Sequence, residues 1–329
     1  MTLRSRLTER LGITHPILGA PMGFVAGGRL AAAVTAAGGL GILGGGYGDA
    51  AWLDREFAAA GNTRVGCGFI GWSLAQHPEL LEQALAHDPA ALMVSFADPA
   101  LFGARIKQAG TILICQVQTK AHAQAAIDSG ADIVVAQGTE AGGHAGSRAT
   151  MALVPEVADL LFRRAPNTLL CAAGGIADGR GLAAALMLGA DGVLVGSRLW
   201  ASAEALVHPN HQRAAIAADG DGTTRQRATD IARLYKWPDE FAARVLKNAF
   251  TERWHNREDE LRVQAETINP GYLGAVAAGD VDNAGVWVGE ATGMINAVLP
   301  ASTIIEAMVA QATMLLMQRA QSFILRRDG

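Results

Sequence analysis

Short apolar runs alternate with amphipathic segments over the first 200 residues of the chain. The apolar runs carry few polar side chains, as expected for strands that are buried on both faces. The segments between them repeat apolar positions at helical spacing, and several begin with Pro, Asp or Thr, which favour a first helical turn. The pattern predicts eight strands, at residues 16–20, 40–43, 64–70, 91–96, 111–117, 133–136, 168–173 and 192–195.

Seven helices are predicted between these strands, at residues 29–37, 50–60, 78–87, 99–109, 119–129, 151–163 and 179–188. This order is typical of an α/β fold, the (β/α)₈ TIM barrel. A doubly wound open sheet is the alternative. It usually needs fewer units, and the glycine-rich turns of this chain follow the late strands instead of the first.

Residues from about 203 to 300 have a different pattern, with polar helical runs at 208–218, 223–234 and 238–247 and no convincing strand. They predict a smaller, mostly helical second domain, at about 206–300, that covers the barrel mouth and the substrate. Apolar positions at helical spacing in 302–325 predict a closing helix. The barrel would then comprise 1–205 plus about 300–329. The apolar surface of the closing helix could also serve as the interface of a homodimer.

Composition sets limits on the partners. The chain has 329 residues, half of them hydrophobic, and a net charge of -4, which gives no reason to expect nucleic acid or an anionic membrane as a partner. The first ten residues lack an apolar segment, and no apolar run reaches about 18 residues, so neither a signal peptide nor a transmembrane helix is expected. Cys67, Cys115 and Cys171 lie in predicted strands and should be buried free thiols. A cytoplasmic location fits these features.

Glycines follow strands seven and eight, where TIM barrels commonly bind phosphate. Their backbone N–H groups can approach an anion closely, the following helix N-termini add favourable dipoles, and a serine hydroxyl can join them. Asp178 is better explained as a helix cap than as a ligand. The predicted phosphate site and the strand ends that lead into it comprise Ala173, Gly174, Gly175, Val195, Gly196 and Ser197.

His144 stands in a run of glycines after strand six. Its neighbours offer no side chains to pack against, so we expect it on a flexible, exposed loop at the barrel mouth. A near-neutral pKa suits a histidine there for acid–base chemistry or anion binding. The other histidines lie on predicted helix faces or outer loops, although His208 and His211 precede the second domain and remain open as cleft residues.

Other strand ends supply candidates for contact with a flat ring. Pro21 and Met22 follow strand one, Gly68 lies near the end of strand three, and Gln116 near the end of strand five. A methionine can form a soft apolar floor, and Gln116 can hydrogen-bond a ring edge. The first strand lacks the Gly-x-Gly-x-x-Gly of a Rossmann dinucleotide site, and the chain has no His-Glu-x-x-His or Cys-x-x-Cys metal motif. We predict no metal.

Four motifs together resemble the nitronate monooxygenase family, formerly called 2-nitropropane dioxygenases. They are the Gly-Ala-Pro-Met of strand one, the Glu-Ala-Gly-Gly-His-Ala-Gly loop, the Ala-Ala-Gly-Gly-Ile-Ala-Asp-Gly turn and Val-Gly-Ser-Arg. Their order and spacing match over roughly residues 10 to 200, and residues 285–293 are also similar. Close relatives of the family include FMN-dependent enoyl-acyl-carrier-protein reductases and NADH:quinone reductases.

The resemblance implies non-covalent FMN, with His144 as the catalytic residue. Some members carry Lys where this chain has Gln116, and many carry a side chain, often Asn, where it has Gly68. A glutamine can only hydrogen-bond where a lysine would add charge, so the resemblance implies a flavin that is tuned differently in this protein. The residues implied to hold FMN are Pro21, Met22, Gly23, Gly68, Gln116, Gln137, Gly142, Gly174, Gly175, Gly196 and Ser197.

Three functions are compatible with these residues. The first is oxidation of alkyl nitronates by dioxygen to a carbonyl compound and nitrite, with His144 binding the small anion or deprotonating a nitroalkane. The second is NAD(P)H-dependent reduction of quinones or enoyl thioesters. An acidic acyl-carrier protein as partner would need a basic rim around the site. Four arginines could supply one, but a solvated helix face explains them more simply: Arg213, Arg225, Arg227 and Arg233. The third is a non-catalytic flavin- or phosphate-binding module.

Overall fold

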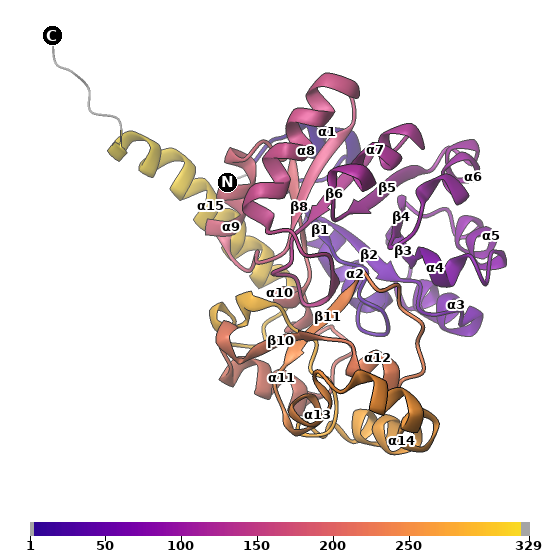
Figure 1. Ribbon diagram of the computed structural model, residues 1–329. Helices are drawn as coiled ribbons and strands as arrows, with labels where there is room; N and C mark the ends of the chain where they lie inside the picture. Colours follow the sequence, from indigo (N-terminus) through magenta and orange to yellow (C-terminus); the bar gives the residue numbers. More distant parts are fainter. Residues whose placement is uncertain (1–2, 324–329) are drawn as a thin grey trace, which may run out of the picture.

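The computed structural model describes residues 3–323, and eight parallel strands close into a barrel within them (Figure 1). The first and last strands pair in parallel, with Ile17 opposite Val193, which completes the ring. All eight predicted strands are present, so the TIM-barrel prediction is confirmed. The strands are β1 (Ile17–Gly19), β2 (Leu40–Gly44), β3 (Gly66–Ile70), β4 (Ala91–Ser95), β5 (Ile112–Val117), β6 (Ile133–Gln137), β8 (Leu169–Ala173) and β9 (Gly192–Val195).

Helices follow the strands as predicted, and short polar side chains begin several of them. Asp49, Thr119 and Asp178 each accept a hydrogen bond from a backbone N–H of the first helical turn. The prediction that Asp178 is a helix cap is thereby confirmed. The helices are α2 (Gly28–Ala36), α3 (Ala50–Ala59), α5 (Glu79–Ala86), α6 (Gly103–Gln108), α7 (Lys120–Asp128), α8 (Thr150–Arg164) and α9 (Gly179–Met187), with the short α1 (Arg6–Leu11), α4 (Gly71–Leu74), η1 (Pro99–Leu101) and α10 (Ser197–Trp200).

Two apolar layers form the core of the barrel. Side chains such as Ile42 and Met93 fill the interior, and the alternate positions of the same strands pack outward against the helices. The three cysteines are buried and free, as predicted, and burial raises the pKa of each thiol, that of Cys115 to about 12. They are therefore packing residues.

The closing helix α15 (Ala301–Phe323) packs against α9 and α2 and then extends away from the barrel (Figure 1). Its contact with α9 is close, because a Cβ at Gly179 would lie 2.5 Å from the carbonyl oxygen of Met308. The Gln311 side chain also accepts a hydrogen bond of 2.7 Å from the Gly179 N–H. The end predicted at Leu325 lies outside the described residues. Within those residues, no helix is long and apolar enough to cross a membrane.

The segment between α10 and α15 is mostly helical, as expected, but it contains two strands where the sequence pattern indicated none. β10 (Thr223–Gln226) and β11 (Ala242–Leu246) pair antiparallel, and β7 (Gly143–Ala145), from the barrel chain, joins β11. Both strands contain Arg, and β10 shows no apolar alternation, which hid them from pattern analysis. The helical elements are α11 (Pro209–Ala217), η2 (Gly220–Gly222), α12 (Ala228–Ala232), α13 (Ala249–Trp254), α14 (Glu258–Ala278) and η3 (Glu290–Met294).

Candidate active site

A cavity of about 430 Å³ lies between the carboxyl ends of the barrel strands and the segment 206–291. Its position agrees with the general rule that TIM-barrel sites are built from the loops at this end. Most of the residues predicted to hold a cofactor line it, although they come from six separate strand ends or loops. They are Pro21, Met22, Gly23, Gln116, Gln137, Gly142, Ala173, Gly174, Gly175, Gly196 and Ser197, and His144 joins them.

Gly68 and Val195 were predicted at the site but do not line the cavity. Val195 is fully buried and points outward into the layer between strands and helices, because the side chains of a strand alternate. Gly68 points inward beneath Pro21, and a Cβ there would lie 2.4 Å from the proline ring. The absence of a side chain at Gly68 therefore leaves the space that the Pro21 ring occupies.

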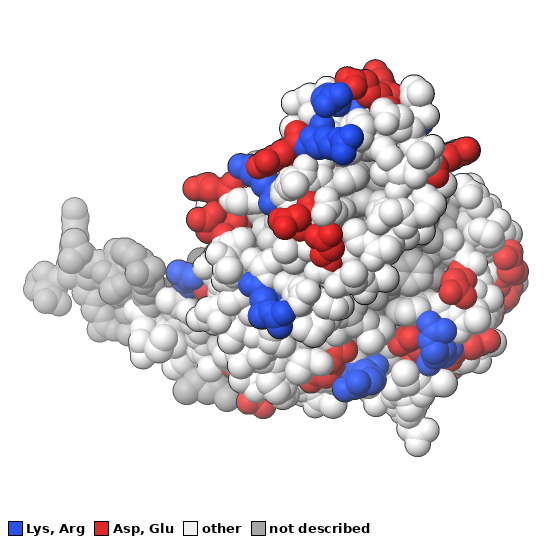
Figure 2. Space-filling model, turned by 90° about the horizontal axis from the view of Figure 1, so that it is seen from below, with Lys and Arg blue, Asp and Glu red and all other residues white. Residues whose placement is uncertain are grey.

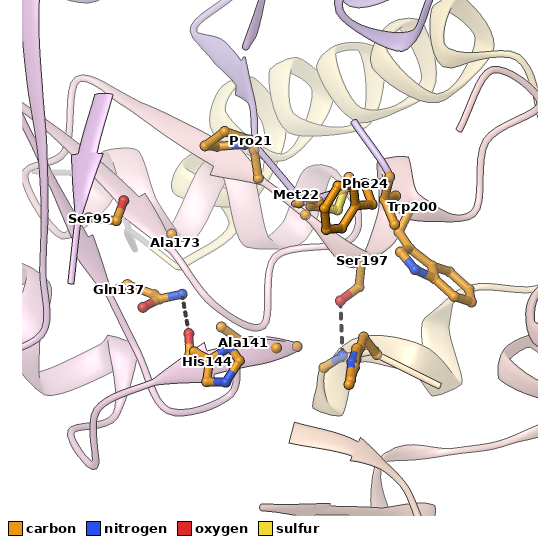
Figure 3. A pocket seen from close by; sticks show the side chains of 18 of the residues that line it. Pro21, Met22, Phe24, Ser95, Gln137, Ala141, His144, Ala173, Ser197 and Trp200 are labelled. Atoms are coloured by element: carbon orange, nitrogen blue, oxygen red, sulfur yellow. Dashed lines mark hydrogen bonds between the residues drawn. The ribbon is translucent and has the colours of Figure 1, made fainter. Parts of the chain in front are cut away.

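The turn after β8 requires glycine. Gly174 and Gly175 have φ angles of 100° and 71°, which side-chain-bearing residues rarely adopt. A Cβ at Gly174 would also lie 2.9 Å from the carbonyl oxygen of Gly138. The neighbouring Ser197 hydroxyl accepts a 2.9 Å hydrogen bond from the Gly289 N–H, which leaves its own O–H to donate (Figure 3). This side of the cavity thus presents backbone and a hydroxyl, as an anion site needs.

A glutamine network holds the strand that carries His144. The Gln137 side-chain oxygen accepts hydrogen bonds from Gln116 at 3.1 Å and Gln118 at 2.9 Å. Its amide nitrogen donates to the His144 carbonyl at 3.0 Å (Figure 3). Gln137 is buried, so these bonds fix which way its amide faces. Gln118 was not predicted, since it follows the strand end and belongs to no motif.

The prediction that His144 lies on an exposed, flexible loop is wrong. The residue belongs to β7 and lies opposite Ala243 of β11. The sequence pattern suggested that the glycines beside His144 make the chain flexible. In the structure they allow other backbone segments to approach closely. The imidazole is only 8% exposed. It stacks on the Trp237 ring with centroids 3.3 Å apart and planes 7° from parallel. Its Nε2 lies 2.8 Å from a carboxylate oxygen of Asp230.

Burial determines the protonation of this pair. Loss of solvation lowers the pKa of His144, although the negative charge of Asp230 and their hydrogen bond oppose the change. Burial alone would raise the pKa of Asp230, but His144 and Arg233 outweigh it, so the pKa of Asp230 is lowered. At neutral pH the arrangement is therefore a neutral imidazole beside a carboxylate. The Nε2–H donates to Asp230, and Nδ1 keeps its lone pair.

Arg233 completes a chain of side chains with His144 and Asp230. Its Nη2 donates to the second Asp230 carboxylate oxygen at 2.7 Å. The side chain is only 16% exposed and lines the cavity, contrary to its assignment to a solvated helix face. Burial favours its neutral form, but Asp230 and the nearby tyrosines oppose this and raise the pKa of Arg233, so it stays charged.

Two more arginines, Arg225 and Arg244, hold the loop before β7 and lie opposite each other on β10 and β11. Arg225 donates to the Thr139 hydroxyl and to the Ala145 carbonyl, and Arg244 donates to the Thr139 carbonyl. Neither forms part of a basic rim.

Sequence analysis missed Asp230 and Trp237 and misassigned Arg233. Asp230 and Arg233 lie in the run 223–234, which was predicted to be helical, and Trp237 lies between two such runs. None of the three belongs to a motif. Trp287 lies within the segment 285–293 that the resemblance covers, and it also lines the cavity. His208 and His211, left open as cleft residues, do line it.

Fold and site together define a TIM barrel with a ligand cavity at the carboxyl ends of its strands and a buried His–Asp pair in the cavity wall. The family model for nitronate monooxygenase matches residues 4–63 and 72–311. The chain belongs to the nitronate monooxygenase family.

Curated relatives carry more than one activity in their names. A nitronate monooxygenase of Neurospora crassa is 31% identical, with 90% of this chain and 88% of that protein aligned. A Mycobacterium tuberculosis protein named (3aS,4S,5R,7aS)-5-hydroxy-7a-methyl-1-oxo-octahydro-1H-indene-4-carboxyl-CoA dehydrogenase is 36% identical over 68% of this chain. The alignment spans only 63% of that dehydrogenase.

Among solved structures, FabK from Thermotoga maritima superposes with a TM-score of 0.85 at 32% identity, covering 98% of this chain and all of that one. The nitroalkane oxidase from Streptomyces ansochromogenes superposes with a TM-score of 0.75 at 27% identity, covering 94% and 98%.

Proposed function

We propose that the protein uses FMN to oxidise alkyl nitronates with dioxygen, giving a carbonyl compound and nitrite. The observation that carries this proposal is the His144–Asp230 pair in the wall of the cavity. Family membership and the Neurospora crassa relative named nitronate monooxygenase support it. A neutral nitroalkane, from which the nitronate forms by loss of one proton, is a substrate that one buried base can deprotonate.

The residues of the cavity fit FMN. Its volume lies within the range of cofactor pockets, about 300–1,000 Å³. Gly174, Gly175, Gly196 and Ser197 would hold the phosphate, and Pro21, Met22 and Gly23 would lie against the ring. When bound, the flavin would accept electrons from the substrate and pass them to dioxygen.

His144 would act as a base through Nδ1. Because Asp230 accepts the Nε2–H, the neutral ring presents only a lone pair at its other nitrogen. That nitrogen can take the α-proton of a neutral nitroalkane and so form the nitronate in the cavity. Trp237 and Asp230 keep the ring in place, and the low exposure keeps water away from the proton.

Product analysis tests the proposal. Purified, flavin-loaded protein mixed with propyl-2-nitronate in air should consume dioxygen and release acetone and nitrite. Release of neither product above the rate with heat-inactivated protein would contradict it.

The pH profile tests the His144–Asp230 pair. Asp230 raises the pKa of His144 against the effect of burial, so D230N should lower that pKa further. The base form exists above the pKa, and kcat/KM for 2-nitropropane should therefore rise with pH through a value below 6.5 and then level off. In D230N the rise should move to lower pH. Turnover should fall at least about tenfold, because the ring loses its fixed tautomer. An unchanged profile would contradict the pairing.

A second candidate function is NAD(P)H-dependent reduction of an enoyl thioester or a quinone. The similarity to FabK over nearly the whole chain favours it. The described residues on the face in Figure 2 carry basic and acidic side chains interspersed, without a basic stripe for an acidic carrier protein. We therefore rank this function second.

We also propose that residues 206–300 form a domain that covers the substrate. The support is that Arg233, Trp237 and Trp287 of this segment line the cavity opposite the barrel. A small-molecule anion and dioxygen are then the expected partners.

A further inference from the structure

The neutral His144 leaves the recognition of an anion unexplained. Its one N–H is donated to Asp230, so Nδ1 can only accept a hydrogen bond. A negatively charged oxygen placed against that lone pair would be repelled. An anionic substrate therefore needs a donor elsewhere in the cavity.

Arg233 is the only Lys or Arg among the described residues that line the cavity. One terminal nitrogen, Nη2, is engaged with Asp230. Within the described part of the chain, Nη1 makes no hydrogen bond, and Nε is buried without a partner. The guanidinium thus uses few of its five donors, and the two N–H groups of Nη1 are free to bind a ligand.

Aromatic rings cover the faces of this guanidinium. Its Cζ lies 4.3 Å from the centre of the Trp287 ring and 4.8 Å from that of Tyr235, and Tyr47 lies at 5.9 Å. Rings attract the cation through their faces but accept none of its in-plane N–H groups as a carboxylate would. They fix the group and leave its edge for hydrogen bonding.

We propose that Arg233 binds the negatively charged oxygens of the substrate and makes the cavity prefer a planar oxyanion over its neutral analogue. The inference rests on the proposed function in so far as that oxyanion is a nitronate. Arginine forms paired hydrogen bonds to such groups, and these are stronger than neutral ones. His144 and Arg233 then have separate tasks, one for the proton and one for the charge.

Ligand binding without turnover tests the inference. The holoenzyme is titrated with 2-methylpropanoate, which resembles propyl-2-nitronate in shape and charge, and with the neutral 2-methylpropanamide, by calorimetry. The wild type should bind the carboxylate more tightly than the amide. R233Q should bind the carboxylate about tenfold more weakly or worse, and the amide as before. R213Q, an exposed arginine on α11, is the matched control and should behave as wild type.

Several outcomes decide the matter. If R233Q keeps the preference for the carboxylate, or the wild type has none, the inference is wrong. Should R233Q fail to fold because Asp230 is left unpaired, the double variant D230N/R233Q removes both charges and must still lose the preference. A protein that prefers the carboxylate but does not oxidise nitronates would refute the proposed function and leave this inference standing. Nitronate turnover by R233Q with an unchanged KM would refute this inference and leave the proposed function standing.

Discussion

Replacing His144 by Asn is expected to lower turnover of 2-nitropropane by about 10²- to 10⁴-fold, the usual contribution of a positioned general base. Asparagine is similar in size and can hydrogen-bond to Asp230, but it cannot take a proton. Turnover of preformed propyl-2-nitronate should fall less, because no proton needs to be removed. FMN should remain bound, since the residues predicted to hold it do not include the imidazole of His144. Steady-state kinetics with both substrates and the flavin content of the purified variant measure these effects.

The surface of the protein offers a matched control for this substitution. His87 stacks on Phe57 with ring centroids 4.3 Å apart and lies 3.0 Å from a carboxylate oxygen of Asp54, so it has the same kinds of partner as His144 but lies on the surface and does not line the cavity. H87N should leave both rates unchanged. Equal turnover of 2-nitropropane by H144N and wild type would show that His144 is not the base.

Replacing Gly174 by Ala is expected to abolish the yellow colour of the purified protein or weaken FMN binding at least about tenfold. The φ angle of 100° costs an alanine energy, on the order of 1–3 kcal/mol for such backbone regions. The new methyl group would also press on the carbonyl oxygen of Gly138 and the Thr150 hydroxyl, each 2.9 Å away. The turn would have to move, and with it the backbone groups predicted to bind the phosphate. Flavin absorbance after purification and a titration with FMN measure the loss.

G130A separates backbone strain from the site. Gly130 has a φ of 75°, and a Cβ there would meet nothing within 4 Å. The variant should lose some stability and keep its FMN. If G174A also retains FMN with wild-type affinity, the phosphate is not held at this turn.

The barrel was predictable because its signals are local. Buried parallel strands leave apolar runs, and caps such as Asp178 mark where helices begin. The glycines after β8 were identified for the same reason, since a turn with positive φ requires them. The partners of His144 were not predictable in this way. Asp230 and Arg233 come close to His144 in a region where β11 pairs with β7, and these strands lie about 100 residues apart in the sequence. Neither strand shows the apolar alternation that would have indicated the pairing.

The expectation that His144 lies on an exposed loop was wrong for a physical reason. A histidine among glycines suggested an exposed loop, because glycines provide no side chains for packing. In the structure, Gly142 lets the backbone of the Val288–Gly289 segment approach so closely that a Cβ would lie 2.5 Å from the Gly289 nitrogen. The packing of His144 comes instead from Trp237, in the loop between α12 and β11. The same glycines that suggested mobility therefore allow burial.

The most direct test of the central claim is anaerobic mixing of the flavin-loaded protein with propyl-2-nitronate, NADH and NADPH in turn, followed by flavin absorbance. If the cavity serves nitronate oxidation, the nitronate should bleach the flavin within the time of turnover, and neither pyridine nucleotide should do so at a comparable rate. Rapid bleaching by NADH or NADPH, with none by the nitronate, would contradict the account and assign the cavity to a reductase.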